Sequence, residues 1–116
     1  MKYKDLFSRY PVTKNRDQIS LERTKVNDYE KKIAREFGKE YFDGPRRMGL
    51  GGYYYNAKYF KPVVDDFIKY YGLNNNSSIL DVGCAKGFML HDFKEALPGC
   101  KVAGIDISQY CIDNCI

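Results

Sequence analysis

Two acidic side chains and two glycines near the C-terminal end of the sequence have the types and spacing that suit nucleoside binding. The apolar run over residues 78–82 predicts a buried strand, and Gly83 and Gly87 follow it within a short turn. Glycines there keep side chains away from a ligand, and amides at the start of the next helix can meet its polar groups. The segment predicts a nucleotide-type pocket at the C-terminal end of a strand.

Asp106 supplies the second half of this pattern. It lies 19 residues after Gly87, at the end of a second strand predicted over residues 101–105. A carboxylate at this place can accept two hydrogen bonds from a ribose diol, and it would repel a phosphate beside the diol. Asp81, two residues before the first glycine, can orient the loop amides or attract an ammonium group. Both acids favour a nucleoside with free hydroxyls.

The loop sequence agrees less well with the binding of a dinucleotide. Its fingerprint requires glycines at positions 83, 85 and 88, where this sequence has Gly83, Ala85 and Phe88. S-Adenosylmethionine has an ammonium group and a ribose diol and carries no phosphate, which suits both acids. If the glycine loop binds no ligand, it is an ordinary strand-to-helix turn.

Residues 79–88 and 104–108 resemble motif I and the acidic motif of the class I S-adenosylmethionine-dependent methyltransferases. The resemblance implies a seven-stranded, mostly parallel Rossmann-like sheet with S-adenosylmethionine as cofactor. It places Asp106 at the ribose and Ile107 beside the adenine. The loop residues that it assigns to the cofactor are Asp81, Gly83, Cys84, Ala85 and Gly87. Ala85 replaces the family's commoner glycine, which leaves less room beside the methionine part.

Apolar spacing predicts the elements around this loop. One helix is expected over about residues 21–37, ended by Gly38, and another over residues 60–71, with Pro62 in its first turn and Gly72 at its end. A third helix follows the glycine loop over residues 88–97, and Ser108 is expected to cap a fourth. Helices alternating with strands from residue 60 onward predict an α/β fold with a parallel sheet, truncated after its second strand.

The chain is expected to divide at residue 60. Residues 1–59 would form a helical extension with a loop rich in tyrosine and glycine, and residues 60–116 the N-terminal part of a cofactor-binding domain. The loop over residues 41–55 is either a cover over a ligand or a connector whose tyrosines pack on the surface. Arg46 and Arg47 within it either contact an anionic group or form a solvated charge pair.

Several other side chains are expected to have no chemical role. Lys86 is predicted to point to solvent, and His91 to be a surface or packed residue. Cys84 is interpreted as a small residue that fits the loop, and no thiol chemistry is expected of it. The four cysteines form no CxxC pair and have no second histidine beside them, so reduced thiols and no metal site are expected.

The composition limits the class of protein. The 116 residues are 44% hydrophobic and 29% charged, which is typical of a globular chain. The net charge of +4 is concentrated in residues 1–47, where 13 basic residues stand against 8 acidic ones. Nucleic-acid-binding surfaces usually carry a denser cluster of basic residues, so a nucleic-acid partner is not favoured. The sequence has neither a signal peptide nor an apolar run of about 18 residues, so a cytoplasmic protein without a membrane segment is expected.

Together these features predict an S-adenosylmethionine-dependent methyltransferase with a small-molecule acceptor. No catalytic residue is assigned, because the acceptor side of the domain would lie beyond the second strand. The chain is therefore expected to be the N-terminal part of a longer gene product, or a truncated one, with an exposed apolar sheet edge that favours a partner or a homo-oligomer. The alternatives are a nonenzymatic cofactor-binding remnant or partner subunit and, less favoured, an NAD-linked oxidoreductase.

Overall fold

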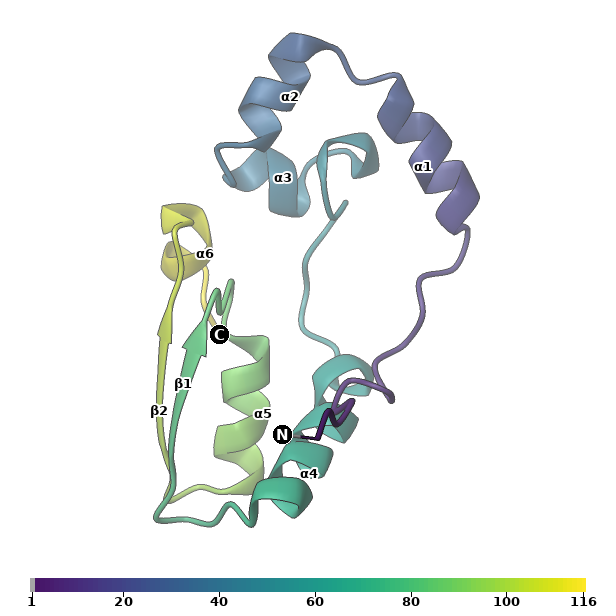
Figure 1. The fold of residues 1–116 in the computed structure, drawn as a ribbon. Coiled ribbons are helices and arrows are strands. Elements are labelled where there is room, and N and C mark those ends of the chain that lie inside the picture. The colour runs from purple at the N-terminus through teal and green to yellow at the C-terminus, as the bar shows by residue number, and fades with distance from the viewer. Residues whose placement is uncertain (1) are drawn as a thin grey trace. The chain divides into compact units, whose positions relative to one another are not determined.

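The computed structural model describes residues 2–116, which form two compact units (Figure 1). The first unit contains the residues up to Pro11, Tyr55–Asp106 and Cys115–Ile116, and the second contains Val12–Tyr54 and Ile107–Asn114. The predicted division into residues 1–59 and 60–116 stays a prediction. None of the helices within residues 2–116 has both the length and the apolar character needed to cross a membrane.

The first unit is built on a parallel sheet of two strands. β1 (Ser78–Val82) pairs with β2 (Lys101–Ile105) in a register that runs from Ser78 opposite Lys101 to Val82 opposite Ile105. α5 (Phe88–Ala96) lies along the strands, and α4 (Ala57–Tyr71) packs against α5 (Figure 1). Both predicted strands and their parallel pairing are confirmed.

The two faces of this sheet differ in exposure. Alternate residues of a strand point to opposite faces, and the half-buried set contains Ile79 and Val102, which are register partners. The other face carries Leu80, Val82 and Ile105, which are 63%, 72% and 56% exposed. This face of the sheet is therefore an exposed apolar surface, whereas the exposed apolar edge expected of a two-stranded sheet stays a prediction.

α4 supplies a large part of the core of the first unit. Val63 and Val64 are fully buried, and the ring of Phe67 meets Phe93 of α5 edge-on at 6.1 Å between centroids. The Asn56 side chain accepts a 3.1 Å hydrogen bond from the Lys58 N–H and caps the helix start. The helix thus begins three residues before the predicted start.

The ends of α4 test two further predictions. Because the helix begins at Ala57, Pro62 lies beyond the first turn, and its predicted place there is wrong. Gly72 ends the helix as predicted, with φ at +62°, a left-handed conformation that glycine adopts without strain.

The second unit contains four short helical elements before α4. They are α1 (Arg16–Thr24), α2 (Asp28–Ala34), α3 (Lys39–Asp43) and the single 3₁₀ turn η1 (Arg46–Met48). The prediction of one helix over residues 21–37 is wrong, because Asn27 interrupts it. The Asn27 side chain accepts a 2.8 Å hydrogen bond from the Glu30 N–H and starts α2 as a separate helix.

The residue that reverses the chain after α2 is Phe37 rather than Gly38. Phe37 has φ at +50°, whereas Gly38 has φ at −95° and is the N-cap residue of α3. Ring contacts hold this aromatic segment together: Phe37 with Tyr41 and Tyr41 with Phe42 at 5.0 Å, and Phe42 with Tyr53 at 5.7 Å. These contacts agree with the interpretation of residues 41–55 as a packed connector, although part of it is helical rather than a loop.

The two arginines of this connector are engaged within the second unit. The Arg46 guanidinium donates to the carbonyl oxygens of Gly49 at 3.0 Å and Leu50 at 2.6 Å. Arg47 forms an ion pair with Glu30 at 3.4 Å. Arg46 therefore stabilises the turn after η1, which is neither of the two roles expected for it.

α6 (Gln109–Asp113) also belongs to the second unit. Ser108 caps it as predicted, accepting a 3.1 Å hydrogen bond from the Cys111 N–H, and the Ser108 hydroxyl donates to the Phe37 carbonyl. The Tyr110 hydroxyl donates to Asp43 at 2.6 Å. This hydrogen bond, helped by burial, raises the pKa of Tyr110 to about 12. Polar contacts thus attach the segment after Asp106 to the N-terminal helices.

Candidate functional site

The turn between β1 and α5 has the backbone conformation that its glycines allow. Gly83 and Gly87 have φ at +85° and +75°, in the left-handed region, and a Cβ added to either would meet no atom within 4 Å. The N–H groups of Gly83 and Cys84 both donate to the Ile105 carbonyl, at 2.8 and 3.1 Å. The loop therefore stays joined to the end of β2 and has open space beside both glycines.

Ala85 occupies the position where the resembling family more often has glycine. Its φ of +48° is also left-handed, a conformation that costs a residue with a side chain about 1–2 kcal/mol. The Ala85 N–H donates to Asp106 Oδ2 at 2.7 Å. A hydrogen bond to a charged acceptor is among the stronger ones in proteins, and this one helps to hold the strained turn.

Asp81 and Asp106 lie close enough to influence each other. Burial, and then the negative charge of Asp106, raise the pKa of Asp81 above its ordinary value. Two neighbouring carboxyl groups at the ends of parallel strands offer several acceptor oxygens and an excess of negative charge. This arrangement suits a ligand with hydroxyl and ammonium donors, so the residues present are compatible with the ribose and amino-acid parts of S-adenosylmethionine.

Cys84 has the packing role that was expected. It is buried, and a Cβ added to Gly104 would lie 2.6 Å from the Cys84 sulfur and 2.7 Å from Leu90 Cδ1. Gly104 therefore lets the loop and α5 approach β2, a role that the sequence analysis missed. Its signal was a glycine inside a predicted strand, which often marks a close approach of the chain. Across residues 2–116 no three acidic, cysteine or histidine side chains gather as a metal site would require.

Lys86 and Ile107 differ in their exposure to solvent. Lys86 is only 6% exposed, so the prediction that it points to solvent is wrong. Its carbonyl accepts a 3.0 Å hydrogen bond from the Ile116 N–H, which places chain from the C-terminal end against the loop. Ile107 is 84% exposed directly after Asp106 and belongs to the second unit, so its contact with adenine stays a prediction.

Tyr55 and Asp92 form a polar pair at α5 that sequence reasoning missed. The Tyr55 hydroxyl donates to Asp92 Oδ1 at 2.5 Å, and this hydrogen bond is the main cause that raises the pKa of Tyr55 to about 12. The Tyr55 ring meets Phe88 and His91 edge-on, at 5.8 and 4.9 Å between centroids. His91 is thus a packed residue, as expected. The available signal was an acid between the apolar residues Leu90 and Phe93.

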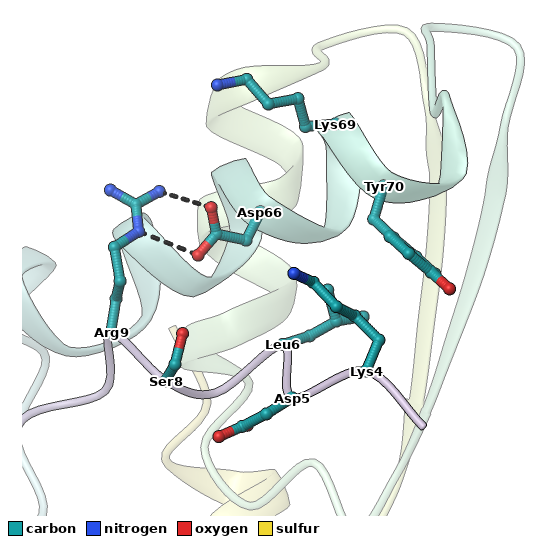
Figure 2. A pocket seen from close by; sticks show the side chains of 8 residues that line it. All are labelled: Lys4, Asp5, Leu6, Ser8, Arg9, Asp66, Lys69 and Tyr70. Carbon is teal, nitrogen blue, oxygen red and sulfur yellow. Dashed lines mark hydrogen bonds and ion pairs between the residues drawn. The ribbon is translucent and has the colours of Figure 1, made fainter. Parts of the chain in front are cut away.

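The pocket in Figure 2, with a volume of about 440 Å³, lies elsewhere in the first unit. Arg9 spans it, donating to both carboxylate oxygens of Asp66 at 2.8 Å and to the Pro62 carbonyl at 2.9 Å. None of the residues predicted to bind the cofactor lines it. The residues that do are Lys4, Asp5, Leu6, Ser8, Arg9, Asp66, Lys69 and Tyr70. The Arg9 contacts fasten the N-terminal segment to α4.

Comparison with protein families supplies an independent observation. Residues 73–116 match the family model described as a methyltransferase domain. This segment contains β1, the glycine loop, α5, β2 and every residue predicted to bind the cofactor. No curated protein and no solved structure matches the chain. The C-terminal part of the chain is thus similar to part of a methyltransferase domain, and its β1–α5–β2 arrangement agrees with the start of a Rossmann-like fold.

Proposed function

We propose that this chain binds S-adenosylmethionine at the glycine loop and takes part in methyl transfer to a small-molecule acceptor. The observation that supports the proposal most directly is the 2.7 Å hydrogen bond from the Ala85 N–H to Asp106. It joins the loop and the acid predicted to bind the ribose into one site, inside the segment that matches a methyltransferase domain.

Each part of the site has a binding role in this proposal. Asp106 holds the loop and is proposed to accept hydrogen bonds from the ribose hydroxyls, because each carboxylate oxygen has two lone pairs. Gly83 and Gly87 leave open space in which the ligand can approach the backbone. Asp81 adds negative charge that attracts a cationic ligand. When bound, S-adenosylmethionine supplies a methyl group already activated by its positively charged sulfur.

The remaining contribution of a methyltransferase is to position the acceptor for in-line attack and to accept its proton where needed. We assign no residue of this chain to that step. A small-molecule acceptor is favoured over nucleic acid because the basic excess is modest and spread through residues 1–47. A homo-oligomer is compatible with the exposed apolar face of β1 and β2.

Calorimetric titration of the full chain tests the binding step. We expect S-adenosylmethionine and S-adenosylhomocysteine to bind, and NADH to bind more weakly or not at all. Asp106→Ala is expected to weaken both sulfur ligands, whereas Asp65→Ala, on the exposed face of α4, leaves their affinity unchanged. Preferential binding of NADH, or no binding of either sulfur ligand, would overturn the proposal. Binding without transfer to any acceptor pool would support a nonenzymatic cofactor-binding module.

A further inference from the structure

The Tyr55–Asp92 pair lies beside the glycine loop within the first unit. Phe88, whose ring Tyr55 contacts, directly follows Gly87 and is the first residue of α5. Asp92 lies one turn further along the same face of the helix, where the Tyr55 hydroxyl reaches it. Tyr55 therefore covers the start of the helix whose N-terminal end is formed by the loop.

Asp92 has an unused acceptor. Its side chain belongs to a residue only 3% exposed, and no described residue donates a hydrogen bond to its Oδ2 atom. Leaving a buried charged acceptor without a donor costs more than a hydrogen bond gains, so nearly all such atoms in native proteins have a partner. A donor from a bound ligand would satisfy Oδ2.

The surroundings favour a positively charged donor. The Tyr55 hydroxyl donates a hydrogen bond to Asp92 and stays protonated at neutral pH, so the phenol oxygen can still accept a hydrogen bond from a ligand. Glu95 adds a further negative charge near Tyr55. The rings of Tyr55, Phe88 and His91 add an aromatic surface, and aromatic faces attract organic cations.

We propose that Tyr55 and Asp92 bind the ammonium group in the amino-acid tail of S-adenosylmethionine. The proposal rests on the function proposed above and specifies the site further. Asp106 meets the loop at Ala85, and Tyr55 meets the chain at Phe88, three residues later. Contacts at these two separate points of the chain suit an elongated ligand with its ribose at one end and its ammonium group at the other.

Two nucleoside probes separate this role from general binding to the site. S-Adenosylhomocysteine carries the ammonium tail, and 5′-methylthioadenosine lacks it but keeps the ribose. Asp92→Asn places an amide where the carboxylate oxygens were, and we expect it to weaken S-adenosylhomocysteine about tenfold or more. Tyr55→Phe removes only the hydroxyl and is expected to weaken it about threefold to tenfold. The affinity for 5′-methylthioadenosine should stay unchanged in both variants.

Matched controls are Tyr71→Phe at the exposed end of α4 and Asp65→Asn, both expected to bind like the unchanged chain. Because Asp92 is buried, thermal unfolding must accompany the titrations, and Tyr55→Phe decides the outcome if Asp92→Asn does not fold. Equal loss for both probes, or no loss for either, would overturn the ammonium assignment while leaving the nucleoside site in place. If the unchanged chain binds neither probe, the proposed function itself fails and this assignment with it.

Discussion

The Ala85 N–H and Asp106 Oδ2 are joined by a 2.7 Å hydrogen bond across 21 positions of the chain. The bond links the turn after β1 to the acid after β2, so the shape of the loop and the orientation of the carboxylate depend on each other. A substitution at Asp106 should therefore change both the stability of the fold and the affinity for a ligand, and conservative replacements can separate the two effects.

Asp106→Asn keeps one carbonyl oxygen that can accept the Ala85 hydrogen bond, whereas Asp106→Ala removes every acceptor. We expect Asp106→Ala to weaken S-adenosylhomocysteine by about 1–3 kcal/mol and to lower the melting temperature more than Asp106→Asn does. Calorimetry and thermal unfolding measure the two effects. Equal melting temperatures for both variants would show that the hydrogen bond does not stabilise the loop.

Ala85→Gly relieves a left-handed conformation that a side chain makes costly. With φ at +48° in the native turn, glycine is expected to raise the free energy of unfolding by about 0.5–1 kcal/mol, after its greater flexibility in the unfolded chain is subtracted. Chemical denaturation measures the change. Ala103→Gly, in the middle of β2, is the control and should be destabilising, because glycine weakens the interior of a strand. A destabilised Ala85→Gly variant would contradict the interpretation that the backbone at Ala85 is strained.

Gly104→Ala introduces a Cβ where the loop and α5 come close to β2. It would meet the Cys84 sulfur at 2.6 Å and Leu90 Cδ1 at 2.7 Å, distances that require one of them to move. Overpacking of this kind costs about 1–3 kcal/mol, which denaturant unfolding can detect. In a double-mutant cycle, Gly104→Ala should cost less in a Cys84→Ala background than in the unchanged chain; an equal cost in both would exclude the sulfur contact as its cause.

Tyr55 and Tyr110 are expected to ionise at unusually high pH. Hydrogen bonds to Asp92 and Asp43 raise both pKa values from the ordinary 10 to about 12. Their contribution to stability should be complete below pH 10 and lost as the pH rises through 12, because the folded chain holds these protons more tightly. Phenolate absorbance during an alkaline titration measures this. Each tyrosine-to-phenylalanine variant should lose one ionisation at the raised pKa. Loss of an ionisation at the ordinary tyrosine pKa instead would refute the prediction.

Asp66 should contribute stability with the opposite pH dependence. The Arg9 guanidinium holds the pKa of Asp66 below its ordinary 3.8, helped by Lys69 and Lys4. Its contribution is therefore present above pH 3.8 and lost as the pH falls through the lowered value. Asp66→Asn is expected to lower the melting temperature at neutral pH but not in strong acid, with Asp65→Asn as the exposed control. A difference that persists in acid would point to another cause.

Much of the first unit could be predicted because its signals are local. The apolar runs over residues 78–82 and 101–105 predict the two strands, and Gly72 has the helix-end role that its residue type favours. The parallel pairing then follows from the alternation of strands and helices. The positions of Asp81 and Asp106 beside each other follow in turn, since the C-terminal ends of parallel strands meet at one edge.

The errors arose where a side chain overrode the apolar pattern. Val26, Tyr29, Ile33 and Phe37 have helical spacing, but the capping hydrogen bond of Asn27 breaks the helix between them. The burial of Lys86 and the Tyr55–Asp92 pair depend on contacts between residues far apart in sequence, which spacing alone does not reveal. The strained φ of Ala85 was also hidden, because the residue type favours a different conformation.

The interlaced composition of the two units bears on how the chain responds to proteolysis. Each unit draws on segments from both sides of the Tyr54–Tyr55 bond, since the residues up to Pro11 belong with α4 and α5, and α6 belongs with α1 to α3. A protease that cuts this bond would leave two fragments, neither of which contains a whole unit. After cleavage the two fragments should therefore stay associated. Neither fragment made alone should fold as it does in the intact protein.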